Sequence, residues 1–283
     1  MDMFSVKIIK ELLNQQRVIP RKGLGQNFLT SRRVFGDILR AANLKKSDTV
    51  LEIGPGIGTL TQGLAQSAKR VIAVEKDFVM VDILKETTKN LPNIEIVHGD
   101  ILGIVLTKGK HMPRIVPTSY KVVANLPYYI TSPVIRKFLE LKENSSPSLM
   151  VLMVQKEVAQ RICAKPPKMS LLAVSVQFYA EPEIISYVKK TCFWPQPKVD
   201  SAILQITPLI NADRKLINTD IFFKIVKAGF KQPRKQLGNN LCKGLSFARP
   251  VVDEWLGSNG IRPAQRAETL SVQDWIKLAK DKM

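Results

Sequence analysis

Three groups in the first half of the sequence have types and a spacing that could hold a nucleoside. Residues 52–58 (Glu-Ile-Gly-Pro-Gly-Ile-Gly) form a glycine-rich turn after an apolar run, Glu75 closes the next apolar run, and Asp100 follows a third. Glycine keeps a turn tight and lets a ligand approach the backbone. At the position of Glu75, 21 residues after Gly54, a carboxylate can accept hydrogen bonds from both ribose hydroxyls. Asp100 could accept from an adenine amino group.

The spacing of the glycines narrows the class of ligand. The pattern is GxGxG, with Thr59 next, rather than the GxGxxG of dinucleotide sites, and no Lys-Ser/Thr pair follows, which excludes a P-loop. It favours an adenosyl cofactor without a pyrophosphate. S-adenosylmethionine fits best, and NAD is the second candidate. Taken singly, Glu75 and Asp100 could instead cap the helices that follow them.

A second element, Asn125-Leu126-Pro127-Tyr128, ends the fourth apolar run. The N6 amine of adenine is a poor nucleophile because its lone pair is delocalised into the ring. The Asn125 side-chain oxygen and the Leu126 carbonyl could accept its hydrogens and free the lone pair, while Pro127 fixes the backbone and Tyr128 stacks on the base. Positioning and electrostatics would then carry the rate. Taken alone, the element could equally be a structural turn at the end of a strand, with an aromatic side chain packed into the protein.

The histidine and cysteine content argues against several other classes of site. His98 and His111 are the two histidines of the chain, so a Ser-His-Asp hydrolase or a histidine-rich metal site is not expected, and we expect no bound metal. The three cysteines are widely spaced and form no CxxC pair, which fits reduced thiols rather than a disulfide framework; they are Cys163, Cys192 and Cys242.

Alternating apolar runs and helical patterns must position these residues. The sequence predicts buried strands at 49–54, 70–75, 94–98, 121–125 and 148–154, and helical stretches follow the first, second and fourth of them. Such alternation predicts βαβ units and a mostly parallel, Rossmann-like α/β sheet covered on both faces. Two later runs, 184–188 and 201–206, predict an antiparallel pair at its edge. Ligands bind such sheets at the carboxyl ends of the strands.

The pattern changes after Pro208, where short helical stripes predict a small all-α domain. We therefore expect an α/β cofactor-binding domain over residues 1–208 and a small helical domain over residues 209–283.

The charge of the chain points to a polyanionic partner. The formal net charge is +19, with +7 in residues 1–46 and again +7 in residues 208–283. Nucleic acid is the first candidate partner and an anionic membrane surface the second. The charge could also reflect a generally basic proteome and no specific partner. No apolar run is long enough for a membrane helix and no secretory signal is evident, so we expect a cytoplasmic protein that does not bind membranes.

Several separate motifs occur together in one order. From Arg21 to the C-terminus the chain resembles the small-subunit ribosomal RNA adenine N6,N6-dimethyltransferases. The segments that carry the resemblance are residues 25–29 (Gly-Gln-Asn-Phe-Leu), 52–56, Glu75, Asp100, 125–128, 155–158, 193–202, 229–237 and 266–271.

The resemblance implies a class I S-adenosylmethionine methyltransferase sheet and a role for each matching residue. The cofactor would be bound by Asn27 and Leu29 near its methionine end, Gly54 beneath it, Glu75 at the ribose, Asp100 at the adenine and Asn125 between cofactor and target. Phe193 is associated with the target base. The family dimethylates two adjacent adenosines near the 3′ end of small-subunit rRNA, which implies an immature small ribosomal subunit as partner, and we expect a monomer.

One segment departs from the family pattern. Residues 169–173 read Met-Ser-Leu-Leu-Ala where the family usually has a Tyr-Gly-Arg-Leu-Ser-like run, which could alter substrate affinity or rate. Three alternatives remain: a large-subunit rRNA adenine N6-methyltransferase, a non-catalytic assembly factor and an NAD oxidoreductase. We also expect five basic side chains to contact RNA phosphates, namely Arg32, Arg33, Lys231, Arg234 and Lys235.

Overall fold

The computed structural model describes residues 2–104, 116–117, 119–141, 145–209 and 217–281, so His111 lies outside the described residues. The chain divides into two compact units. One comprises Met1–Ala159 with Glu183–Pro208, and the other Gln160–Pro182 with Leu209–Met283. The limits 1–208 and 209–283 stay a proposal for the domains, and residues 160–182 group by their packing with the helical unit.

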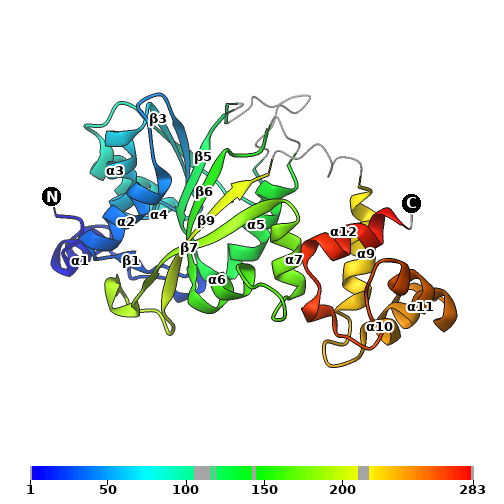
Figure 1. Cartoon of the computed structure of the whole chain (residues 1–283). Coiled ribbons are helices and arrows are strands. Elements are labelled where there is room, and N and C mark those ends of the chain that lie inside the picture. The colour runs from blue at the N-terminus through cyan, green and yellow to red at the C-terminus, as the bar shows by residue number, and fades with distance from the viewer. Residues whose placement is uncertain (1, 105–115, 118, 142–144, 210–216, 282–283) are drawn as a thin grey trace. The chain divides into compact units, whose positions relative to one another are not determined.

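The first unit is built on a sheet of seven strands in the order β4-β3-β2-β5-β6-β9-β7 (Figure 1). The first five in that order pair in parallel, whereas β9 runs antiparallel to β6. The predicted fold class is therefore confirmed. The strands are β2 (Thr49–Ile53), β3 (Arg70–Glu75), β4 (Ile94–His98), β5 (Lys121–Asn125), β6 (Leu149–Gln155), β7 (Ala180–Val188) and β9 (Ser201–Pro208).

Helices flank this sheet on both sides (Figure 1). They are α2 (Arg32–Ala42), α3 (Thr59–Ser67), α4 (Phe78–Thr88), α5 (Thr131–Leu139) and α6 (Lys156–Ile162). In α2, the buried residues recur every fourth position, at Val34, Ile38 and Ala42, and they pack with apolar residues of α3 and of the central strands. Burial of that stripe fixes the helix against the sheet.

The N-terminal segment forms its own small cluster. Helix α1 (Val6–Gln15) buries Ile9, Leu12 and Leu13 against residues of α4 and of the glycine-rich turn. It is followed by a short turn, η1 (Lys22–Leu24), and by β1 (Phe28–Leu29). Strand β1 pairs antiparallel with β8 (Phe193–Trp194), which follows the turn η4 (Lys190–Cys192).

The second unit is helical, as the sequence predicts after Pro208. Its elements are α7 (Leu171–Gln177), α9 (Thr219–Gly229), α10 (Leu237–Leu245), α11 (Arg249–Ser258), η5 (Ala267–Thr269) and α12 (Val272–Lys280). Its core joins both of its segments, since the ring of Phe178 stacks on that of Phe222 with centroids 4.1 Å apart. Over the described residues, no helix of the protein is long and apolar enough to cross a bilayer.

Candidate active site

The sheet topology brings four of the predicted site residues into one row. Gly54 follows β2, Glu75 ends β3, Asp100 follows β4 and Asn125 ends β5. Because these strands are parallel neighbours in the order β4-β3-β2-β5, the row runs Asp100, Glu75, Gly54, Asn125. The strand order reverses between β2 and β5, which is where open α/β sheets bind their ligands.

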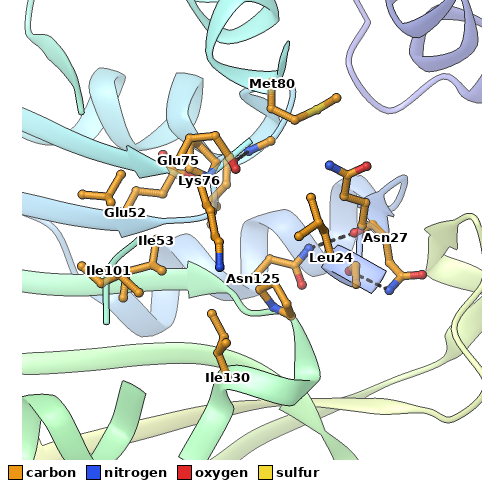
Figure 2. Close-up of a pocket in the computed structure, with 18 of the residues that line it drawn as sticks. Leu24, Asn27, Glu52, Ile53, Glu75, Lys76, Met80, Ile101, Asn125 and Ile130 are labelled. Atoms are coloured by element: carbon orange, nitrogen blue, oxygen red, sulfur yellow. Dashed lines mark hydrogen bonds between the residues drawn. The ribbon is translucent and has the colours of Figure 1, made fainter. Parts of the chain in front are cut away.

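A pocket lies at this edge of the sheet (Figure 2). All six residues predicted to bind the cofactor line it: Asn27, Leu29, Gly54, Glu75, Asp100 and Asn125. Figure 2 shows Glu52, Glu75 and Lys76 grouped on one side, with Leu24, Asn27 and Asn125 together on the other.

Gly54 lines the pocket with its backbone, in a conformation that favours glycine. Its φ is +65°, in the left-handed region that disfavours side chains. Its N–H donates to the Val74 carbonyl at 2.9 Å, which ties the turn to β3. A Cβ at this position would lie 3.9 Å from Cδ of Pro127, so it would narrow the space between the turn and the residues after β5.

Glu75 ties the glycine-rich turn to the start of α4. One carboxylate oxygen accepts from the Gly56 N–H at 3.0 Å and the other from the Asp77 N–H at 2.8 Å. The side chain is buried. Burial raises the pKa of this carboxyl, and the backbone donors oppose that rise. The second lone pair of each oxygen can still accept from a ligand hydroxyl.

Asp100 is held by a lysine that the sequence pattern did not single out. Lys76 Nζ lies 2.8 Å from Oδ2 of Asp100, while Oδ1 accepts from the Leu102 N–H at 2.9 Å. The hydrogen bond from Lys76, followed by that from Leu102, lowers the pKa of Asp100. The carboxylate is thus ionised and oriented at the pocket wall.

Glu52 is the second residue that sequence reasoning missed. Its side chain is 1% exposed and lines the pocket, and Oε2 finds no hydrogen-bond partner among the described residues. Burial, reinforced by the nearby charge of Glu75, raises the pKa of Glu52 to about 8, although Thr61 partly offsets the rise. A charged residue inside the apolar run 49–53 was the available signal.

The other wall is formed by residues 24–29, which belong to a segment, residues 21–29, that we call the strap. Asn27 Nδ2 donates to the Gly25 carbonyl at 3.0 Å, and Asn125 Nδ2 donates to the Asn27 carbonyl at 3.1 Å. Leu29 is buried and pairs with Phe193 across the β1–β8 ladder. The strap therefore brings Asn27 and Leu29 to the pocket from a distant part of the sequence, and Figure 2 shows Asn27 beside Asn125.

The remaining residues of the Asn-Leu-Pro-Tyr element occupy three different environments. Pro127 lines the pocket, whereas the Leu126 side chain is 2% exposed and packs inside the unit. Tyr128 begins the short turn η2 (Tyr128–Ile130) and its hydroxyl lies 2.8 Å from Oγ of the buried Ser201. The ring of Tyr128 is not part of the pocket lining; the half-exposed Tyr129 is.

The structure does not bring Phe193 to the pocket. Its side chain is 3% exposed and packs in the apolar cluster that contains Leu29, Val34 and Ile203. A direct contact between this ring and a target base stays a prediction.

The basic side chains predicted to contact phosphates differ in whether they already form an ion pair within the protein. Arg32 pairs with Asp2 at 2.8 Å and lies over the ring of Phe4, although its side chain is exposed. Lys231, Arg234 and Lys235 are exposed on the turn between α9 and α10. Among the described residues, Glu268 pairs with Arg266 rather than with any of these three.

Buried Asn240 gives that turn its shape. Its Nδ2 donates to the Gly229 carbonyl at 2.7 Å and to the Gln232 carbonyl at 3.0 Å. The basic side chains at positions 231, 234 and 235 are therefore presented by a fixed turn.

The segment that departs from the family pattern, residues 169–173, is part of the helical core. Met169 and Ala173 are buried, and the Ser170 hydroxyl accepts from the Ala173 N–H at 3.1 Å as the N-cap of α7. These positions stabilise the second unit by packing and capping.

No group of three or more His, Cys, Asp or Glu side chains in the described part of the chain is arranged to hold a metal ion. The pocket combines three acidic side chains with a single basic one, Lys76, among its described lining residues.

Comparison with known proteins decides the family. The model of the ribosomal RNA adenine dimethylase family matches residues 19–282. The chain belongs to this family. As a member of the ribosomal RNA adenine dimethylases it is an enzyme of methyl transfer, and the NAD oxidoreductase is set aside.

The relatives of this ribosomal RNA adenine dimethylase include both curated proteins and solved structures. Ribosomal RNA small subunit methyltransferase A of Dehalococcoides mccartyi is 46% identical over 95% of this chain and 90% of its own length. A dimethyladenosine transferase from Plasmodium falciparum is 27% identical, with a TM-score of 0.75 over 89% of this chain and 96% of that one. The 23S rRNA methyltransferase ErmE is also 27% identical, with a TM-score of 0.71 over 90% and 98%.

Proposed function

We propose that this protein dimethylates the N6 amino groups of two adjacent adenosines near the 3′ end of small-subunit rRNA, with S-adenosylmethionine as methyl donor. The observation that carries the proposal is the row formed by Asp100, Glu75, Gly54 and Asn125 at the edge of the sheet. The Asn-Leu-Pro-Tyr element is complete, which argues against a non-catalytic assembly factor.

The small subunit is favoured over the large one by sequence. A solved neighbour acts on 23S rRNA, but it is 27% identical to this chain, whereas the Dehalococcoides relative, which is named for the small subunit, is 46% identical.

The pocket residues fit S-adenosylmethionine. The turn at Gly54 has no side chain, and its positive φ favours glycine there, so the backbone is open to a ligand. With Glu52 protonated at neutral pH, the carboxylates of Glu75 and Asp100 against the single Lys76 still leave the lining acidic, which suits a ligand that carries a sulfonium and an ammonium charge and disfavours a pyrophosphate. We assign the methionine end to Asn27 and Leu29, the ribose to Glu75 and the adenine to Asp100. When bound, S-adenosylmethionine would supply the electrophilic methyl group.

The chain itself orients the amine that is to be methylated. Because Nδ2 of Asn125 donates to the Asn27 carbonyl, Oδ1 is the atom of that amide available to accept a hydrogen bond. We assign Oδ1 and the Leu126 carbonyl to the N–H groups of the adenine, and Pro127 to the fixed backbone between them. Tyr128 and Phe193 are proposed to support the extruded base, which requires Phe193 to leave its packed position.

The net charge of +19 supports an RNA partner. We propose that basic side chains on both units contact phosphates of the immature small subunit, that the protein acts as a monomer, and that it works in the cytoplasm. Phosphate contacts would select the particle, and the pocket would select adenine.

Primer extension tests the proposal, since N6,N6-dimethyladenine cannot pair and stops reverse transcription. Small- and large-subunit rRNA would be mapped in cells that lack the protein, with and without the parent gene or the Asn125→Ala gene. We expect two adjacent stops near the 3′ end of small-subunit rRNA that disappear in the deletion and return only with the parent. Stops that persist in the deletion, or that are lost from large-subunit rRNA, would overturn it.

A further inference from the structure

The orientation of Asn125 depends on a main-chain atom of the strap. The amide of Asn125 donates to the carbonyl of Asn27, 98 positions earlier, at 3.1 Å. The acceptor is a backbone oxygen rather than a side chain, so the geometry of this contact is only as fixed as the strap itself (Figure 2). Whatever holds the strap in place therefore also fixes the amide of Asn125.

The residue next to Asn27 anchors the strap on the far side of the pocket. Gln26 Nε2 donates to Oδ2 of Asp77 at 2.9 Å, and Gln26 Oε1 accepts from the Arg21 N–H at 2.8 Å. Arg21 also pairs with Asp77 at 3.5 Å. Asp77 is 5% exposed, and its other oxygen caps α4 through the Val79 N–H at 3.1 Å. A buried capping carboxylate is a rigid anchor.

The strap is also packed directly on the turn that follows Asn125. Gly25 has a φ of +63°, and a Cβ there would lie 3.0 Å from Cβ and 3.3 Å from Cα of Pro127. The backbone of the strap at Gly25 thus packs so closely on Pro127 that a side chain at position 25 would force one of the two to shift.

We propose that Gln26 and Asp77 are positioning residues for the methyl-transfer step: their hydrogen bond, the latch, holds the strap closed over the pocket and thereby fixes the amide of Asn125. The latch also connects the two ends of the pocket, because Asp77 donates its N–H to Glu75 at 2.8 Å. The role of Asn125 in this inference rests on the proposed function.

A polarity swap tests the latch without changing its shape. Gln26→Glu alone sets a carboxylate against the buried carboxylate of Asp77, and Asp77→Asn alone sets an amide N–H group against that of Gln26. The double variant restores a donor, an acceptor and the parent charge, and the introduced carboxylate can still accept from the Arg21 N–H. Asparagine caps a helix about as well as aspartate, so α4 is preserved. Asp82→Asn, on the exposed face of α4, is the matched control.

Two readouts on the full-length protein separate the latch from the chemistry. Hydrogen exchange of the peptide that covers residues 21–29, measured without cofactor, reports whether the strap is closed. Single-turnover methyl transfer at saturating S-adenosylmethionine reports whether Asn125 is oriented. We expect each single variant to speed exchange and to slow transfer roughly tenfold to hundredfold. The double variant and the control should resemble the parent. Gly25→Ala should slow transfer by a similar factor through the contact with Pro127.

The outcomes are distinct. Strap exchange in both single variants equal to the parent's would overturn the latch. Faster exchange with unchanged transfer, or failure of the double variant to recover, would overturn its role in positioning Asn125. If the parent itself does not methylate rRNA, the proposed function fails, while the exchange measurement still decides whether the latch exists.

Discussion

The side-chain amide of Asn125 and the main-chain carbonyl of Asn27 are joined by a hydrogen bond of 3.1 Å. This contact joins the carboxyl end of β5 to a segment nearly a hundred residues earlier. It engages Nδ2 of the Asn125 amide inside the protein and leaves Oδ1 as the atom that can accept a hydrogen bond from a ligand.

Asn125→Ala should lower single-turnover methyl transfer by about a hundredfold or more, because it removes an acceptor that matters most as the amine becomes nucleophilic. The affinities for RNA and for S-adenosylmethionine should change far less. Rapid-quench assays with pre-bound particle, together with calorimetry of cofactor binding, measure the three quantities. Near-normal transfer would make the Asn-Leu-Pro-Tyr element a structural turn.

The cofactor assignment predicts a contrast between two glycines. Gly54→Val should abolish S-adenosylmethionine binding in calorimetry, since its side chain would enter the pocket. Gly260 has a similar φ of +72°, and a Cβ at that position would meet nothing within 4 Å. The Gly260→Val variant therefore carries the same backbone strain elsewhere and should bind S-adenosylmethionine normally.

Asp100→Ala should weaken S-adenosylmethionine binding by about 1–3 kcal/mol, the cost of an unpaired polar partner. Unchanged affinity in both pocket variants would contradict the assignment.

Glu52 predicts a stability that falls as the pH rises. Its pKa is about 8 in the folded protein, whereas the ordinary pKa of a glutamate side chain is 4.5. Between these two values the folded state binds one proton more than the unfolded state, so this group lowers the free energy of unfolding by on the order of 1 kcal/mol per pH unit as the pH rises. Above about pH 8 that contribution is fully lost.

Glu52→Gln should therefore flatten the dependence of stability on pH between 5 and 8, and the variant should be more stable than the parent at the alkaline end. Urea unfolding at several pH values measures both. Parallel curves for parent and variant would show that Glu52 is ionised in the folded state.

The basic turn between α9 and α10 predicts salt-dependent binding to the particle. Replacing Arg234 and Lys235 by glutamine should weaken binding to the immature small subunit and reduce the log–log salt slope by about 0.7–0.9 per lost phosphate contact. Replacing the exposed Lys277 and Lys280 on α12 removes the same charge from another face of this unit. Binding that responds equally to both pairs would indicate a general charge effect rather than a contact at the turn.

Two variants of Phe193 can separate a role of its ring in methyl transfer from its contribution to stability. Phe193→Ala should slow methyl transfer, but at 3% exposure it should also cost about 3–5 kcal/mol of stability. Phe193→Leu keeps most of the volume and removes only the aromatic ring. Slower transfer in the leucine variant, at a temperature where it is folded, would support stacking on the base. Normal transfer would assign Phe193 to the β1–β8 packing alone.

The row of strand-end residues could be predicted because a parallel sheet has little freedom there. Once Gly54, Glu75, Asp100 and Asn125 each end an apolar run, βαβ topology places them at one edge. The same reasoning could not find the pairing of Gln26 with Asp77, or that of Lys76 with Asp100. These contacts depend on how a loop crosses the pocket and on side-chain reach, neither of which has a period in the sequence.

Burial explains the remaining differences. Phe193 lies just before the Pro-Gln-Pro of residues 195–197 and looks like a loop residue, yet the two-residue pairing of β1 with β8 places its ring in the apolar cluster. Glu52 looks like part of a glycine-rich motif, and the lack of a partner for its Oε2 among the described residues becomes visible only when the side chains around it are placed.

The helical unit is assembled from two stretches, Gln160–Pro182 and Leu209–Met283. Phe178, on the first stretch, stacks on Phe222, on the second, so neither can complete the core alone. During synthesis, residues 160–182 leave the ribosome before α9 does, so the ring of Phe178 stays uncovered at least until Phe222 has been made. A protein shortened at residue 208 would keep the apolar side chains of residues 160–182 exposed and should therefore be prone to aggregate.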